Sequence, residues 1–102
     1  MTDLHARKLV TVVCEAALEQ RVLEALREAG ASGYTAGEVR GGGGRGERAG
    51  DWEGARSVEI KVLCDEGTAQ RLAEALIARY SDDFALALWV ADVAVARPAK
   101  FT

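Results

Sequence analysis

The chain has 102 residues, of which 49% are hydrophobic and 28% are charged, and its formal net charge is −3. These values are typical of one soluble globular domain, and the negative charge argues against nucleic acid or an anionic membrane as a partner. No run approaches the ~20 apolar residues that a membrane span needs, and residues 1–8 lack the apolar stretch of a signal peptide. We therefore expect a single cytoplasmic domain over residues 1–102 that is not inserted in a membrane.

Six elements are predicted from the spacing of apolar residues. The β-branched run at residues 8–14 predicts a strand. Apolar positions from Leu18 to Ala29 then recur at helical spacing, with Gly30 where a helix stop is expected. The remaining expected elements are a strand at about 32–40, a strand at 58–62, a helix from Ala69 to Tyr80 and a long strand from Ala85 to Ala96.

An internal repeat relates the two halves of the chain. Cys, Gln, Arg, Glu, Ala and Leu of residues 14–26 recur in residues 64–76 at a constant offset of 50, and Glu15 corresponds to Asp65. The repeat predicts two units, each a strand followed by a helix and another strand. The order βαββαβ favours an α+β fold, a four-stranded antiparallel sheet with two helices on one face.

The first and last strands of the chain have apolar residues on both faces. Leu9 and Val13 alternate with Val10 and Val12 in the first strand, and the last strand is equally two-faced. Two helices cover one face only, and soluble monomers rarely expose a large apolar patch. We therefore expect another subunit to cover the second face, in a number that periodicity alone leaves open.

The two cysteines are expected to be free thiols. Cys14 and Cys64 lack CxxC spacing and histidine companions, which argues against a metal site. They end neighbouring strands at opposite edges of the expected sheet, on the order of 15 Å or more apart at ~3.3 Å per residue. A disulfide needs Cα atoms within ~7 Å, so both cysteines are interpreted as small core residues.

The connection at residues 40–56 is the main candidate for function. It holds seven of the eleven glycines, with four arginines against three acids. Glycine lets backbone N–H groups surround an anion, and Arg45 and Arg48 can both reach one phosphate chain. The alternative is a flexible spacer. Trp52 either contacts a partner or folds back on its own subunit.

Catalytic constellations are not apparent. His5, the only histidine, is expected in a frayed terminus, and no serine or cysteine has a visible base partner. Glu15, Asp65 and the pair Asp82–Asp83 are interpreted as helix-end and turn residues. The sequence therefore favours a protein that is not an enzyme and that needs no cofactor or metal.

The segment from Gly30 to Gly43 resembles the stretch that leads into the T-loop of PII signalling proteins. Gly33-Tyr34-Thr35, the glycine run and Arg45 with Arg48 are more closely similar to the carbon-associated PII-like proteins, which include the cyanobacterial regulator of the sodium-dependent bicarbonate transporter. The similarity runs over about residues 8–101. It implies a ferredoxin-like homotrimer with an adenine nucleotide in each cleft between subunits and a T-loop at about 41–56.

The resemblance also implies roles for individual residues. Thr35 matches a residue that contacts adenine, and Lys61 and Leu63 match strand positions whose backbone holds the base. Gly41 and Gly43 match loop positions near the sugar and phosphates, and Arg45 and Arg48 match phosphate-binding arginines. The adjacent wall is assigned to Leu88 and Trp89.

Two departures and one further ligand refine this expectation. The glycine- and lysine-containing B-loop of PII proteins is missing, and residues 80–84 stand in its region. AMP or ADP, or cyclic AMP, is therefore expected to bind better than ATP. The loop also lacks a tyrosine that could be uridylylated. Bicarbonate is a candidate second ligand, because the carbon-associated branch responds to it.

The expected mechanism is a two-state T-loop that is ordered when ligand binds and is read by a partner. Trp52, Glu53 and Arg56 are the candidate partner-binding residues, and a bicarbonate transporter or another membrane protein is the candidate partner. Three alternatives stay open: a trimeric copper-tolerance (CutA-like) protein, an RNA-binding domain of the same fold class, and an effector-binding module of a metabolic enzyme. The acidic charge and the mainly aliphatic sheet count against RNA.

Overall fold

The computed structural model describes residues 3–41, 56–80 and 85–102. The element order is βαββαβ, with a short 3₁₀ turn before the first helix and another after the last strand. The elements are β1 (His5–Glu15), η1 (Ala16–Leu18), α1 (Glu19–Ala29), β2 (Thr35–Val39), β3 (Ser57–Cys64), α2 (Glu66–Tyr80), β4 (Leu86–Val95) and η2 (Pro98–Lys100).

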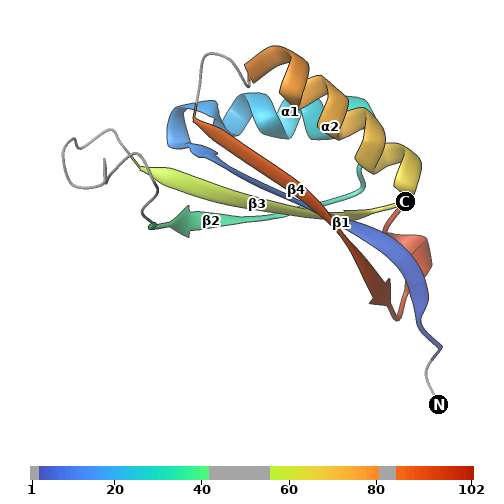
Figure 1. Ribbon diagram of the computed structural model, residues 1–102. Helices are drawn as coiled ribbons and strands as arrows, with labels where there is room; N and C mark the ends of the chain where they lie inside the picture. Colours follow the sequence, from blue (N-terminus) through green and yellow to red (C-terminus); the bar gives the residue numbers. More distant parts are fainter. Residues whose placement is uncertain (1–2, 42–55, 81–84) are drawn as a thin grey trace.

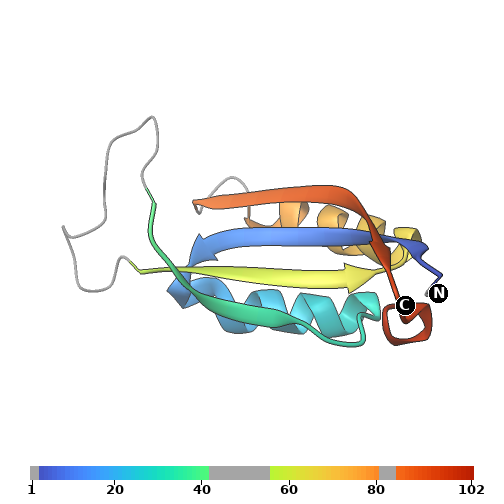
Figure 2. The same cartoon turned by 90° about the horizontal axis from the view of Figure 1, so that it is seen from below.

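The four strands form one antiparallel sheet in the order β2-β3-β1-β4. β1 and β3 are the central strands, as expected, and β2 and β4 are the edges. Both helices lie on the same face of the sheet (Figure 1), and the view from below shows the other face without helices (Figure 2). The ferredoxin-like α+β fold predicted from the repeat is confirmed.

The core lies between the sheet and the two helices. Alternation along a strand places every second side chain on the helix side, and these are the even-numbered residues of β1 and β3. Val10, Val12, Ile60 and Val62 are at most 1% exposed, and α2 contributes Leu72 at 0%. Burial of such aliphatic side chains contributes roughly 1.5–3 kcal/mol each, so this layer is the main source of the subunit's stability.

The helix ends follow from local sequence. Gly30 ends α1 in the left-handed conformation with φ 96°, which costs glycine no Cβ clash, and its N–H donates to Arg27 O at 3.1 Å. At the start of α2, the Asp65 Oδ1 atom accepts the Thr68 N–H at 2.8 Å, a normal N-cap bond. Arg71 donates to Ala29 O at 3.0 Å and so ties the two helices together at this end.

Two expectations about element bounds are corrected. β2 covers Thr35–Val39 and not 32–40, and the Ser32 hydroxyl instead donates to Lys100 O. His5 does not lie in a frayed terminus, because it is the first residue of β1 and pairs with Val95 of β4. The partner strand is remote in sequence, so local periodicity carries no signal for this pairing.

The two cysteines are free and buried. The register pairs Lys8 with Cys64 and Cys14 with Val58, so the thiols lie at opposite ends of the central strand pair. Six residue steps along a strand span about 20 Å, well beyond disulfide range. Within the part of the chain that the structure describes, no helix is long and apolar enough to cross a membrane.

Candidate functional site

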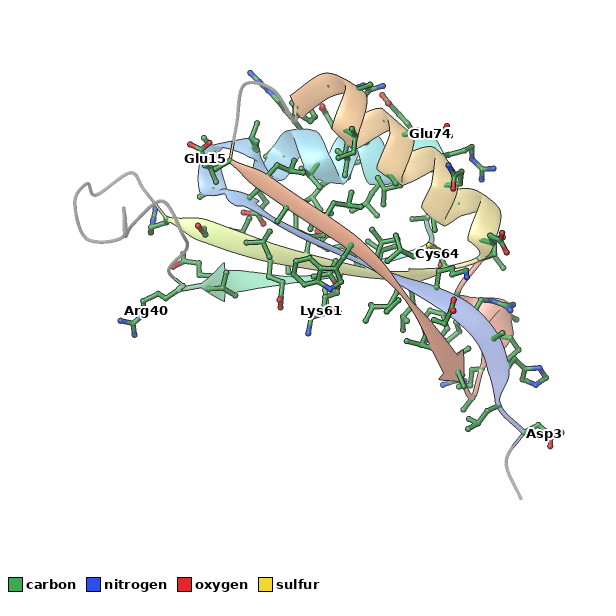
Figure 3. All side chains as sticks on the ribbon, in the orientation of Figure 1. Asp3, Glu15, Arg40, Lys61, Cys64 and Glu74 are labelled. Carbon is green, nitrogen blue, oxygen red and sulfur yellow. The ribbon has the colours of Figure 1, made fainter. Side chains whose placement is uncertain are left out.

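The sheet face turned away from α1 and α2, hereafter the open face, carries the candidate site. Because the even-numbered residues of β1 and β3 point toward the helices, the odd-numbered residues point the other way. Figure 3 shows Lys61 extending from the sheet on the side opposite to the helices, whereas Cys64 lies between the sheet and α2. The open face is formed mainly by Leu9, Thr11, Val13, Glu59, Lys61, Leu63, Ala87, Trp89 and Ala91.

One row of residues crosses all four strands of this face. Thr35 pairs with Lys61, Lys61 pairs with Thr11, and Thr11 pairs with Trp89. Directly opposed residues of antiparallel strands share a face, so these four side chains form a cross-sheet row about 14 Å long at ~4.8 Å per strand. The register thus brings together three residues that the sequence resemblance assigned to nucleotide binding, and adds Thr11.

The cross-sheet row combines polar groups with one large aromatic ring. Thr35 and Lys61 are exposed and Trp89 is 49% exposed, whereas Thr11 between the two longer side chains is only 2% exposed. The Lys61 Nζ atom lies 3.5 Å from Glu59 Oε1, with side chains 50% and 31% exposed. An ion pair this accessible contributes about 0–1 kcal/mol, so Lys61 can exchange Glu59 for an anionic ligand at little cost.

Leu63 lies two residues along β3 from Lys61 of the cross-sheet row, opposite Leu9. The pairing between β2 and β3 begins at Thr35 and Lys61, so β3 from Val62 to Cys64 extends beyond the start of β2. Among the described residues, this stretch of backbone has a strand neighbour on the β1 side only. Its other edge offers N–H and C=O groups, which is the kind of edge that can bind a planar heterocycle.

Leu88 is separated from these residues. It pairs with Val12, and it packs against the hydrophobic core on the helix-covered face. The structure therefore brings Thr35, Lys61, Leu63 and Trp89 to one face and places the Leu88 side chain on the other. Leu88 lies in the same strand as Trp89, but its side chain is on the opposite side of the sheet.

The two ends of the long β2–β3 connection are described at Gly41 and Arg56. The Arg56 Nη1 atom lies 3.6 Å from Glu38 Oε2, and both side chains are 67% exposed. The Arg56 carbonyl also accepts the Ala16 N–H at 2.8 Å, so the base of the connection is attached to the end of β1. The other candidate residues of the loop, namely Gly43, Arg45, Arg48, Trp52 and Glu53, lie outside the described residues.

Glu15 has a role that differs from the helix-end role expected of it. It precedes η1 but makes no side-chain cap bond there. Its Oε2 atom instead accepts the Ala85 N–H at 3.2 Å. Asp65, at the corresponding place in the repeat, does cap its helix, and hydrogen bonds from the Thr68 backbone and hydroxyl, with Arg71 nearby, lower the pKa of its carboxyl.

The sequence does not predict the hydrogen bonds that hold residues 98–101 against the rest of the subunit. Arg7 Nε donates to Phe101 O at 2.8 Å and Arg7 Nη2 donates to Pro98 O at 3.0 Å. Together with the Ser32–Lys100 bond, these contacts hold residues 98–101, the C-terminal hook, against the start of β1 and the α1–β2 connection. The partners are 91, 94 and 68 residues apart, so no local motif indicates them.

The thiols are unsuited to nucleophilic chemistry. Burial, followed by the charges of Glu19 and Glu15, raises the pKa of the Cys14 thiol to about 11. Burial, with Asp65, also raises the pKa of Cys64. Reactive cysteines are thiolates with lowered pKa values, so both thiols stay protonated at neutral pH. Nowhere in the described part of the chain are three or more His, Cys, Asp or Glu residues arranged to hold a metal.

A four-stranded antiparallel sheet in the order β2-β3-β1-β4, covered on one face by two helices, is a ferredoxin-like α+β fold. The sequence matches the family model described as nitrogen regulatory protein P-II over residues 7–100. The chain therefore belongs to the P-II family. No match was found among curated protein sequences. The family match favours the PII-like interpretation over a CutA-like or an RNA-binding protein.

Solved structures of similar chains agree with this assignment. A PII-like signalling protein from Thermus thermophilus is 38% identical, with 98% of this chain and 99% of that chain covered and a TM-score of 0.83. CPII from Thiomonas intermedia, solved with ADP and bicarbonate, is 24% identical, with both chains covered completely and a TM-score of 0.87. A further CPII structure, with ADP, AMP and bicarbonate, is 24% identical, covers 99% and 98%, and has a TM-score of 0.85. At that identity, CPII supports the shared fold.

Proposed function

We propose that this protein is a non-enzymatic regulatory sensor that binds an adenine nucleotide, AMP or ADP, in clefts between the subunits of a homotrimer. The observation that carries the proposal is the placement of Thr35, Lys61 and Leu63 on one face of β2 and β3, the two strands that an arginine-rich loop connects, in a chain of the P-II family. The chain belongs to the carbon-associated branch of that family in this proposal.

The proposed adenine contacts are a hydroxyl and a strand edge. The Thr35 hydroxyl can donate and accept, and the free backbone edge of β3 at Leu63 offers the alternating groups that a purine edge can pair with. Trp89 supplies an aromatic surface on which a base or a ribose can rest. Leu88 precedes it in β4 and contributes its backbone only, because its side chain packs against the core. Trp89 lies on the opposite edge strand, so it serves the neighbouring cleft or the subunit contact.

The phosphates are assigned to the loop. Gly41, at the described start of the loop, and Gly43 are assigned to the sugar and the first phosphate, and Arg45 and Arg48 to the phosphate chain, because backbone N–H groups and guanidinium donors suit anions. Residues 80–84 lack lysine and glycine, so no cation is available there for a third phosphate. AMP and ADP are therefore placed ahead of ATP, with cyclic AMP as a further candidate.

The apolar open face supports the homotrimer. Leu9, Val13 and Leu63 are only partly covered within one subunit, and Trp89 is 49% exposed. A neighbouring subunit that covers this face would complete their burial. The clefts formed along the sheet edges would then combine the β2 side of one subunit with residues of the next.

The signal is proposed to pass through the T-loop at 41–56. Trp52, Glu53 and Arg56 are the candidate contacts for a partner, and a bicarbonate transporter or another membrane protein is the candidate reader. Bicarbonate is proposed as a second ligand because CPII, which shares the fold, was solved with ADP and bicarbonate. The sensor would then join adenine-nucleotide state to inorganic carbon in the cytoplasm.

The experiment is isothermal titration of the purified protein with AMP, ADP, ATP and cyclic AMP, each with and without bicarbonate. We expect one nucleotide per subunit, tighter binding of AMP or ADP than of ATP, and recovery of the nucleotide unchanged. The double variant Arg45→Ala/Arg48→Ala should bind at least about tenfold more weakly, because charged hydrogen bonds to phosphate are lost. The matched control, Arg21→Ala/Arg27→Ala on exposed positions of α1, should bind normally.

Each outcome decides a part of the proposal. Failure of the wild type to bind any of the four nucleotides would overturn the sensor. Binding without a bicarbonate effect would keep the nucleotide site and remove the carbon link. Equal affinity in the double variant and its control would remove the phosphate assignment of Arg45 and Arg48.

A further inference from the structure

The end of β1 is where the two repeat units differ. In the second unit, Cys64 and Asp65 lead directly into α2, and the Asp65 carboxylate caps that helix through Thr68. In the first unit, Cys14 and Glu15 lead into the 3₁₀ turn η1, and Glu15 makes no cap bond. The side chain of Glu15 is longer by one methylene, and its carboxylate is used elsewhere.

The Glu15 carboxylate accepts a hydrogen bond where the next backbone pair of the β1–β4 ladder would lie. The β1–β4 pairing stops at Cys14 opposite Leu86, so the next pair would be Glu15 with Ala85. The backbone of β1 turns into η1 at this point, and the Ala85 N–H instead donates to Glu15 Oε2 at 3.2 Å. Figure 3 shows Glu15 beside the start of β4.

The adjacent residue, Ala16, makes a backbone hydrogen bond at the corresponding place beside β3. The β1–β3 pairing stops at Glu15 opposite Ser57, so the next pair would be Ala16 with Arg56. The Ala16 N–H donates to the Arg56 carbonyl at 2.8 Å. Two consecutive residues therefore hold the last residue before β3, which ends the long loop, and the last residue before β4.

We propose that Glu15 is a positioning residue that couples the start of β4 to the end of the β2–β3 loop, through the Glu15–Ala16 junction. A ligand that fixes the loop at Arg56 acts on the junction and through it on Ala85. The β1–β4 ladder ends at Cys14 opposite Leu86, and beyond it the Glu15 carboxylate is the acceptor of the Ala85 N–H. The effect on ligand affinity rests on the proposed function, whereas the contact with Ala85 does not.

The first experiment uses the free protein and needs no nucleotide. Hydrogen exchange of the Ala85 amide, followed by NMR, is compared in wild type, Glu15→Ala, Glu15→Gln and Glu15→Asp. Loss of a hydrogen bond to a charged acceptor should speed this exchange roughly tenfold in Glu15→Ala. Glu15→Gln keeps an oxygen acceptor of the same length and should restore most of the protection. Glu15→Asp is too short and should resemble Glu15→Ala.

The second experiment measures AMP and ADP affinity of the same variants by titration. The control is Glu24→Ala, which removes an equally charged, exposed glutamate from α1. We expect Glu15→Ala to bind about three- to tenfold more weakly than Glu24→Ala, with rescue by Glu15→Gln, while the Ala85 amide of wild type becomes more protected on binding. If Glu15 had a purely structural role, Glu15→Ala would lower the melting temperature and Glu15→Gln would not restore the affinity for AMP and ADP.

The outcomes separate this proposal from the proposed function. Unchanged Ala85 exchange in Glu15→Ala overturns the positioning role, whether or not nucleotide binds. Faster exchange with affinity equal to that of Glu24→Ala overturns the coupling to the site. Faster exchange in a protein whose wild type binds no nucleotide supports the contact with Ala85 and overturns the sensor.

Discussion

The two faces of the sheet are built from alternate residues of the same strands, and they are packed in opposite ways. On the helix-covered face, Val10, Val12 and Ile60 are completely buried within one subunit. On the open face, Lys61 is exposed and Trp89 is 49% exposed. Stability therefore depends mainly on even-numbered positions of the central strands, whereas the proposed recognition uses odd-numbered ones. Substitutions one residue apart should have different consequences.

The largest expected effect is on the covered face. Ile60→Ala should lower the free energy of unfolding by about 2–5 kcal/mol, because it leaves a cavity among fully buried neighbours. Denaturant unfolding at fixed protein concentration measures the change, and Ile60→Val, with an expected loss of about 0.5–1.5 kcal/mol, is the graded control. A loss for Ile60→Ala as small as that for Ile60→Val would break the division between the two faces.

The next effect is on the open face. Leu9→Glu should leave the subunit folded and weaken subunit association roughly a hundredfold or more, because an unpaired charge would be buried at the contact. Size-exclusion chromatography with light scattering should show the mass falling from that of a trimer to that of a monomer. Ala78→Glu, at an exposed position of α2, is the matched control. A Leu9→Glu protein that keeps the wild-type mass would show that the open face is not the subunit contact.

The smallest effect is a pH dependence from the covered face. The pKa of Cys14 is raised from 9.0 to about 11 by burial, so the folded state keeps its proton longer than the unfolded state. Its contribution is fully present below pH 9 and is lost as the pH rises toward about 11. The melting temperature of wild type should therefore fall more steeply between these pH values than that of Cys14→Ala. Parallel curves would contradict the raised pKa.

Local sequence patterns predicted the elements and the fold but only part of the site. Alternation in β1 and β3 and the repeat of Cys14 in Cys64 predicted the central strands, because burial on one face imposes period two. Thr35, Lys61 and Trp89 came from resemblance. Thr11 joins them only through the register of β1 with both neighbours, and register is a non-local property.

The remaining surprises have the same physical origin. Glu15 follows the pattern of a helix-end acid, and only the distant Ala85 makes it a ladder acceptor. His5 resembles a terminal residue until β4 is placed beside it. Ser32 lies outside β2, and its hydroxyl instead donates to the distant Lys100 carbonyl. Each case depends on a contact between residues that are far apart in the chain, which local periodicity does not report.

The C-terminal hook has a consequence for the order in which the molecule folds. Contacts between residues so far apart carry a large loop-closure cost and tend to form late. Arg7 cannot bind the carbonyl of Phe101, nor Ser32 that of Lys100, until residues 98–101 have been synthesised. The end of the sheet that holds the start of β2 is therefore secured last. The edge of the sheet where nucleotide recognition is proposed would then be held in place only after the contacts of residues 98–101 have formed.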